Sequence, residues 1–237
     1  MLKIENLTKR YGEKIAVNNL SLHIAPGEIY VFIGHNGAGK TSTLKCIVGI
    51  QDFDEGEIYI NSKSIKNQPI ECKKLFAYIP DNPDIYDFMT GIQYLNFVAD
   101  IFEVSQQKRS ELIKKYADMF EISGSLNDAI NSYSHGMKQK LVIISALIHS
   151  PKLIIMDEPF VGLDPKASHI LKGIMCQICD DGGAIFFSTH VLEVAEKLCD
   201  RVAIIKNGNL VVSGTIDEVK GDGSLEEVFL ELEDENA

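Results

Sequence analysis

A glycine-rich segment, GHNGAGKT, lies between a strand-like segment and a helix-like segment at residues 34–41. It fits the pattern G-x-x-x-x-G-K-[ST], whose glycines let the backbone wrap closely around phosphates. Lys40 is expected to reach the outer phosphates and the Thr41 hydroxyl to bind Mg²⁺. An ordinary glycine turn is the alternative, and the flanking elements disfavour it. The predicted nucleotide-binding residues here are Gly34, His35, Asn36, Gly37, Ala38, Gly39, Lys40, Thr41 and Ser42.

Two adjacent carboxylates end the apolar segment LIIMDEP. Asp157 is placed to hold the Mg²⁺ shell, and Glu158, pointing to the other side, to polarise an attacking water. Phosphoryl transfer depends on positioning and charge neutralisation more than on covalent help. A strand ending in Asp-Glu is common by itself, and it gains weight here because it accompanies the phosphate loop.

A second anion-binding end is predicted at NSYSHGMKQKLVIISALIHS. The positions Leu141, Ile144, Ser145 and Ile148 have helical spacing, and Ser134 is a plausible N-cap. The first N–H groups of such a helix have no partner within it and favour anions. The chain therefore carries two helix starts suited to phosphate.

The surrounding pattern must position these residues. Buried apolar strands that alternate with helices predict an α/β fold with a mainly parallel sheet. A helical pattern runs from residue 90 to residue 116, and RVAIIKNGNLVVSG predicts a strand pair around a glycine turn. We expect a P-loop NTPase core with an N-terminal antiparallel β portion and an inserted helical subdomain. The expected parts are residues 1–86 with 151–216 (nucleotide-binding core), 87–150 (helical subdomain) and 217–237 (acidic C-terminal helix and tail).

Within this last part, one apolar helical face is expected from Leu225, Val228, Phe229 and Leu232.

Composition adds further constraints on the partners and the location of the chain. The chain has 237 residues, 45% of them hydrophobic, and a formal net charge of −11. So acidic a chain lacks the basic face that nucleic acid requires, and we expect no nucleic-acid partner. We see no secretory signal and no apolar run of about 18 to 20 residues, so we expect a cytoplasmic chain that reaches a membrane only through another polypeptide.

Nearly the whole chain resembles the ATP-binding cassette (ABC) ATPases, with motifs in the family's order. Tyr11 stands where the family stacks an aromatic ring on adenine, YSHGMKQK resembles its signature motif, VGLDP its D-loop, and STH, ending at His190, its switch histidine. The resemblance implies an ATP- and Mg²⁺-dependent ATPase with Glu158, His190 and Lys40 as catalytic residues. It also implies two cassettes arranged head to tail, in which Ser134 and Gly136 of one cap the γ-phosphate held by the other.

Two departures from the family pattern stand out. His135 and Met137 replace a glycine and a glutamine of the commonest signature, and neither removes a backbone donor as proline would. Asp81 stands where the family usually has a glutamine that reaches Mg²⁺ and water. Asp81 either binds the metal through a water or caps a turn before Asn-Pro.

The resemblance favours the detached ATPase subunit of an ABC exporter. Its partners would be a second copy or a related cassette, and a separate transmembrane permease that holds it at the inner face of the cell membrane. A groove in the helical subdomain would receive a permease helix near Tyr86, Phe88 and Met89, unless these side chains are simply core. The alternatives are a soluble ABC ATPase outside transport and a non-hydrolysing nucleotide sensor.

Overall fold

The strands of the central sheet are almost continuously apolar, as expected for strands covered on both faces. In the computed structural model, which describes residues 1–234, this sheet has the order β10-β9-β3-β8-β7-β6. Its strands are β3 (Ile29–Ile33), β6 (Phe76–Ile79), β7 (Leu153–Asp157), β8 (Ala184–Thr189), β9 (Arg201–Lys206) and β10 (Asn209–Thr215). All neighbours pair in parallel except β9 and β10, which form a hairpin. The predicted mainly parallel sheet and glycine-turn strand pair are confirmed.

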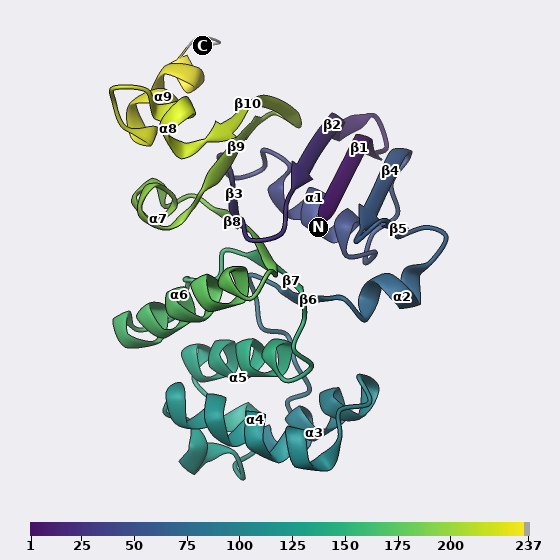
Figure 1. Cartoon of the computed structure of the whole chain (residues 1–237), viewed down its shortest axis with the longest axis vertical. Helices are drawn as coiled ribbons and strands as arrows, with labels where there is room; N and C mark the ends of the chain where they lie inside the picture. Colours follow the sequence, from purple (N-terminus) through teal and green to yellow (C-terminus); the bar gives the residue numbers. More distant parts are fainter. Residues whose placement is uncertain (235–237) are drawn as a thin grey trace.

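A second sheet, entirely antiparallel, has the order β2-β1-β4-β5. Its strands are β1 (Leu2–Tyr11), β2 (Lys14–Ile24), β4 (Glu55–Ile60) and β5 (Lys63–Ser64). Helix α1 (Lys40–Ile47) packs in one buried cluster with residues of both sheets, and Figure 1 shows it behind β1 and β2. The predicted N-terminal antiparallel portion is confirmed, and α1 lies where the two sheets meet.

Three helices form a layer at the far end of the molecule from the C-terminus (Figure 1): α3 (Gly91–Ile101), α4 (Gln106–Met119) and α5 (His135–Leu147). Thr90 caps α3 with a capping box, in which its hydroxyl accepts from Gln93 N. The helical pattern of residues 90–116 is two helices, because the chain turns after α3 with Glu103 at a φ of 55°. Two short 3₁₀ turns, Ser123–Ser125 and Ile130–Ser132, connect α4 to α5.

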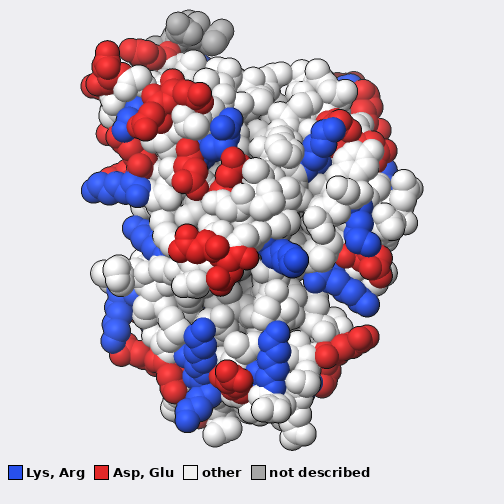
Figure 2. Space-filling view, viewed as in Figure 1, with Lys and Arg blue, Asp and Glu red and all other residues white. Residues whose placement is uncertain are grey.

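The remaining helices are α2 (Pro69–Lys73), α6 (Pro165–Asp180), α7 (Leu192–Leu198), α8 (Ile216–Lys220) and α9 (Leu225–Asp234). Asp164 caps α6 by accepting from Ala167 N, and Pro165 fills the first helical position, where no N–H is needed. The predicted C-terminal apolar face is confirmed, since Leu225 is buried and its three companions pack against the main core. Figure 2 shows acidic side chains gathered around α8 and α9. Residues 235–237 of the predicted tail lie outside the described residues.

The large helical layer is reached from β6 and returns to the sheet through β7. These two strands are parallel neighbours, with Phe76 opposite Leu153 and Ile79 opposite Met156. In residues 1–234, no helix is long and apolar enough to cross a membrane.

Candidate nucleotide-binding site

The phosphate loop joins the end of β3 to the start of α1 and approaches its neighbours very closely. Gly37 and Gly39 have φ angles of 85° and 112°, a region that side chains disfavour. A Cβ on Gly39 would lie 2.4 Å from the Ala16 carbonyl oxygen, and one on Gly34 2.5 Å from that of Ile205. The glycine pattern is therefore a structural requirement, and the loop closes tightly around the start of α1.

Lys40 is buried, and its ammonium group lies at the centre of this loop. Its Nζ donates to the carbonyl oxygens of Gly34 at 2.5 Å and His35 at 3.3 Å. Burial lowers the pKa of Lys40, and the nearby carboxylates of Glu158 and Asp157 oppose this shift. The chain thus supplies a desolvated positive charge where a phosphate would lie against the loop's N–H groups.

Asp157 ends β7 and is almost fully buried. The Thr41 hydroxyl donates to its Oδ2 at 2.6 Å, and the Ser188 hydroxyl donates to its Oδ1. Burial raises the pKa of Asp157, while these two hydrogen bonds oppose the rise by stabilising the carboxylate. The hydroxyl and carboxylate oxygens predicted to serve the metal are therefore adjacent.

This donor set fits Mg²⁺, which uses hard oxygen ligands and commonly takes only one or two from carboxylates. Among residues 1–234, no group of three or more His, Cys, Asp or Glu side chains is arranged to hold a metal ion. A metal here would therefore be shared between Thr41, Asp157 and phosphate or water oxygens. Asp81 lines the same cavity as these two residues.

Glu158, the next residue, contacts different partners from those that Asp157 contacts. It has a φ of 47°, which is unusual for a residue with a side chain, and its N–H donates to the Ser188 hydroxyl at 3.2 Å. Its Oε1 lies 3.9 Å from Lys40 Nζ, and its Oε2 lies 3.0 Å from His190 Nδ1. The three residues predicted to be catalytic are therefore brought together.

Most of the predicted nucleotide-binding residues line one cavity of 290 Å³. It is lined by Tyr11, Lys14, Ala16, His35, Asn36, Gly37, Gly39, Lys40, Thr41, Ser42, Asp81, Asp157 and Glu158. Tyr11 lies at the rim, 43% exposed, and its hydroxyl lies 2.5 Å from Gln51 Oε1. Gly34 and Ala38 do not line the cavity and serve the close packing of the loop instead.

Ser134 and Gly136 lie elsewhere. The prediction that Ser134 caps α5 is confirmed, because its Oγ accepts from Met137 N at 3.2 Å. Neither Ser134 nor Gly136 lines the cavity around Lys40. One chain therefore keeps its two phosphate-suited helix starts apart.

Sequence reasoning missed two kinds of residue in this region. Ser188, which bonds both Asp157 and Glu158, lies opposite Asp157 in the register of β7 and β8. The signal was available in AIFFSTH, since a polar residue at the end of a neighbouring parallel strand reaches the same sheet edge. Lys14 and Ala16 come from β2 of the other sheet, and no motif marks them.

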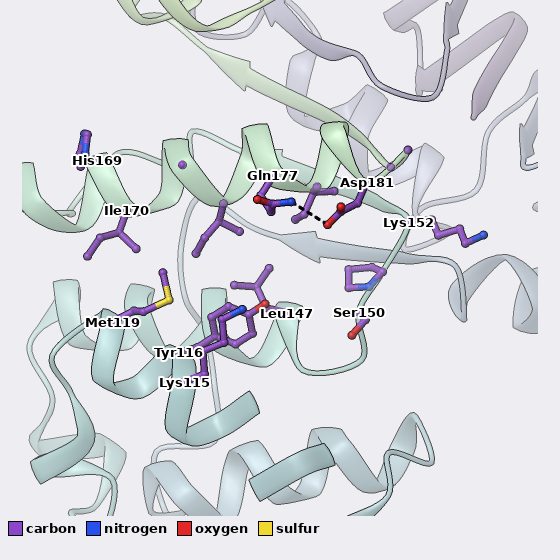
Figure 3. A pocket seen from close by; sticks show the side chains of 16 residues that line it. Lys115, Tyr116, Met119, Leu147, Ser150, Lys152, His169, Ile170, Gln177 and Asp181 are labelled. Atoms are coloured by element: carbon purple, nitrogen blue, oxygen red, sulfur yellow. Dashed lines mark hydrogen bonds between the residues drawn. The ribbon is translucent and has the colours of Figure 1, made fainter. Parts of the chain in front are cut away.

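A larger cavity of 680 Å³ lies away from these groups, between α6 and the helices α4 and α5. Figure 3 shows Met119 of α4 and Ile170 of α6 facing each other across it, with Gln177 bonded to Asp181 at its far end. None of the predicted catalytic or nucleotide-binding residues lines it. The candidate site is thus the smaller, polar cavity.

Comparisons with known proteins agree with this geometry. The family model described as ABC transporter matches residues 17–161. The chain is 33% identical to the ABC-type transporter ATP-binding protein EcsA of Bacillus subtilis, over all of this chain and 98% of that protein. It is 36% identical to YxlF of the same organism, an uncharacterized ABC transporter ATP-binding protein, over 93% of this chain and 72% of that one.

Comparison with solved structures leads to the same family. A structure described as the ATP-binding subunit of an ABC transporter superposes with a TM-score of 0.94 at 33% identity, covering 98% of this chain and 99% of that one. The ATP-binding cassette MJ0796, solved as a dimer bound to ADP and Pi, has a TM-score of 0.83 at 23% identity, covering 91% and 98%, and so shows the shared fold. With a phosphate loop, a buried Asp157 beside Thr41 and this family match in one molecule, the protein is an ATPase that belongs to the ABC transporter family.

Proposed function

We propose that this ATPase is the nucleotide-binding subunit of an ABC exporter whose permease is a separate polypeptide. Two copies would close head to tail around two MgATP molecules. The observation that carries the proposal is the separation within one chain: the cavity around Lys40 does not include the open start of α5 at Ser134. A second chain is therefore needed to bring such a helix start to the γ-phosphate.

The residues then have distinct roles. The loop of residues 34–42 holds the phosphates, Lys40 neutralises the outer ones, and Tyr11 stacks on the adenine at the rim. Thr41 and Asp157 would hold Mg²⁺, with Asp81 near it, and the ion would supply charge neutralisation on the phosphates. Glu158 polarises water while His190, 3.0 Å from it, orients its carboxylate. Ser134 and Gly136 serve the nucleotide of the partner copy.

An exposed aromatic group marks the proposed permease contact. Phe88 is 83% exposed and Tyr86 49%, and both lie in the segment before α3. Tyr86 packs its ring against Phe88 and against Phe97 of α3, with ring centroids 5.8 and 5.7 Å apart. Met89, the third residue predicted here, is partly buried against the core. We propose that residues 87–150 form a subdomain whose Phe88 and Phe97, with the adjacent Tyr86, contact the permease at the inner face of the membrane.

The test of the head-to-tail pair uses Glu158→Gln, which removes the polarising carboxylate while keeping its size. MgATP should then hold a dimer that sedimentation velocity detects, because hydrolysis no longer reopens it. ADP should leave the chain monomeric, since it lacks the bridging phosphate. Adding Ser134→Arg places a bulky side chain at the start of α5 and should return the protein to monomer while ATP binding at Lys40 persists.

Two results would contradict this proposal. The first is a monomeric Glu158→Gln protein at saturating MgATP, and the second is an ATP dimer that survives Ser134→Arg. Copurification from source membranes tests the transporter role separately. A consistently absent permease would favour a soluble ABC ATPase instead.

A further inference from the structure

The side chain of His135 lies directly on the backbone of Gly162. A Cβ built on Gly162 would be 2.5 Å from Cδ2 of His135 and 2.8 Å from its Nε2, far inside normal contact. Gly162 also has a φ of 81°, which a side chain would strain. The first residue of α5, whose side chain is exposed, therefore covers the turn that precedes α6, and a side chain at residue 162 would strain the backbone and displace the ring.

Two more contacts join the same segments. A Cβ on Gly136 would lie 2.8 Å from the Gly162 carbonyl oxygen, so the two backbones meet directly. Lys140 Nζ lies 2.7 Å from Oδ2 of Asp164, the residue that caps α6. The start of α5 is thus fastened to the start of α6 at neighbouring points.

The turn beneath His135 begins at the predicted water-polarising residue. The N–H of Val161 donates to the Glu158 carbonyl oxygen at 3.1 Å, and the N–H of Leu163 donates to that of Phe160 at 3.3 Å. These bonds make residues 158–163 one compact turn. The turn therefore connects Gly162 with Glu158, four residues earlier, whose φ of 47° departs from the usual range.

Farther along, α6 packs into the main core with Leu171 and Met175, but its side toward α4 and α5 is incompletely packed. The 680 Å³ cavity separates the middle and end of α6 from α4 and from the end of α5 (Figure 3). Gly173, in the middle of α6, has nothing within 4 Å of a built Cβ. A cavity deprives its lining of van der Waals partners, so the contacts at the two helix starts carry more of the alignment of α6 with α5.

We infer that His135 is a positioning residue for hydrolysis: its ring holds Gly162 and, through the turn, sets the direction of the Glu158 carboxylate. This inference rests on the proposed function, in which Glu158 acts on the nucleotide of its own chain while Ser134 contacts that of the partner. His135 then links the hydrolytic group of one site to the phosphate-holding helix start of the other.

The test compares His135→Ala, His135→Phe and His135→Gln with the matched control His169→Ala, an exposed histidine of α6 away from the turn. His135→Ala should lower kcat for ATP about tenfold or more, as expected for a misplaced catalytic group, with KM nearly unchanged. Phe should restore most of kcat because its flat ring also covers Gly162, whereas Gln should not. His169→Ala should behave like the wild type.

A double-mutant cycle adds a second measure. Gly162→Ala should lower kcat because its Cβ collides with the ring. Combined with His135→Ala, it should cost clearly less than the product of the two single effects, since residues in contact are not additive. Thermal unfolding of each variant separates these effects from loss of folding.

The inference is wrong if His135→Ala keeps wild-type kcat, if Gln rescues better than Phe, or if the two substitutions multiply independently. It is also wrong if His135→Ala abolishes the MgATP dimer of Glu158→Gln, because the ring then acts on the partner's phosphate. Failure of the proposed function looks different. In that case the Glu158→Gln protein with His135 intact forms no MgATP dimer at all.

Discussion

At the scale of single residues, the site holds an unusual set of charges. Asp81, Asp157 and Glu158 line one small cavity together with Lys40. Asp157 and Glu158 have hydrogen-bond or ionic partners from other elements, whereas Asp81 accepts, among residues 1–234, from the N–H of the adjacent Asn82. That bond is the turn-capping interaction expected of an Asp before Asn-Pro. Asp81 also lines the cavity around Lys40, so this bond through Oδ1 is compatible with a metal contact as well.

The two roles of Asp81 predict different results. If Asp81 couples to the metal, Asp81→Ala should lower ATP turnover about tenfold or more while the Kd for ATP stays within about twofold, since other groups hold the phosphates. Lys40→Ala is the contrasting variant and should weaken ATP binding itself, by about 1.5 to 3 kcal/mol. Steady-state kinetics and equilibrium binding make the comparison. Unchanged turnover in Asp81→Ala would show that Asp81 caps the turn and does not couple to the metal.

Many of the site residues that the sequence predicted are ones that a motif places side by side along the chain, such as Lys40 and Thr41. Asp157 and Glu158 were found in the same way, whereas Tyr11 and His190 were predicted from the family's order of motifs. Ser188 was missed because its importance comes from the strand register, which sets it opposite Asp157. Lys14 was missed because it comes from the other sheet, and no local spacing reveals which strands meet there.

At the scale of the elements, one histidine joins three of them. His149 follows α5, stacks on Phe102 at the end of α3 with ring centroids 3.7 Å apart, and bonds the Phe76 carbonyl oxygen of β6 at 3.2 Å. A carbonyl only accepts, so Nε2 carries the proton. Nδ1 is buried and has no hydrogen-bond partner among residues 1–234. Burial lowers the pKa of His149, and the charge of Lys108 lowers it further, whereas the Phe76 bond opposes this.

This arrangement predicts how stability depends on pH. As pH falls below about 6.5, the unfolded chain takes up a proton that the folded chain resists, so the free energy of unfolding should fall until the folded pKa is reached. Above about pH 6.5, His149 should not change the free energy of unfolding, because it is neutral in both states. His149→Gln, which cannot titrate, should show a weaker dependence between pH 7.5 and 5.5 in urea unfolding. His169→Gln is the control, and an unchanged slope in His149→Gln would contradict the assignment.

The elements were predicted well where periodicity is strong, as in the buried strands and in α5. The break between α3 and α4 was not predicted, because its sequence has neither glycine nor proline and the turn depends on Glu103 adopting a left-handed conformation. The cavity beside α6 was also unforeseen. It depends on how far apart two helices pack, and periodicity gives only the face that each one buries.

At the scale of the whole molecule, apolar groups are exposed where a partner is proposed. The aromatic group of Tyr86, Phe88 and Phe97 belongs to α3 and the segment just before it. Figure 1 shows α3 at the opposite end of the molecule from α8 and α9, around which Figure 2 shows acidic side chains. Phe88 has the largest exposed fraction of the three. Exposed aromatic clusters of this kind are typical of protein interfaces.

This arrangement predicts the effect of Phe88→Glu. Loss of an aromatic anchor commonly costs about 2 kcal/mol or more, so the amount of chain recovered with source membranes should fall by roughly tenfold or more. ATP turnover of the purified chain should not change. Ile70→Glu is the matched control, because Ile70 is 64% exposed on α2, outside the aromatic group. Full membrane recovery of Phe88→Glu would place the permease contact elsewhere.

The pairing of β6 with β7 has a consequence for how such a molecule can change over time. Because these strands run in the same direction, the chain between them must travel back along the sheet, a distance of about 3.3 Å for each residue of strand. The helical layer forms this crossover connection, so it cannot be deleted and replaced by a tight turn. It can be exchanged for another crossover of equal reach, and the sheet that carries the phosphate loop would keep its register. Under the proposed function, recombination of the part of this segment that precedes α5 would change the membrane contact, whereas the start of α5, with Ser134 and Gly136, would have to be inherited with the sheet.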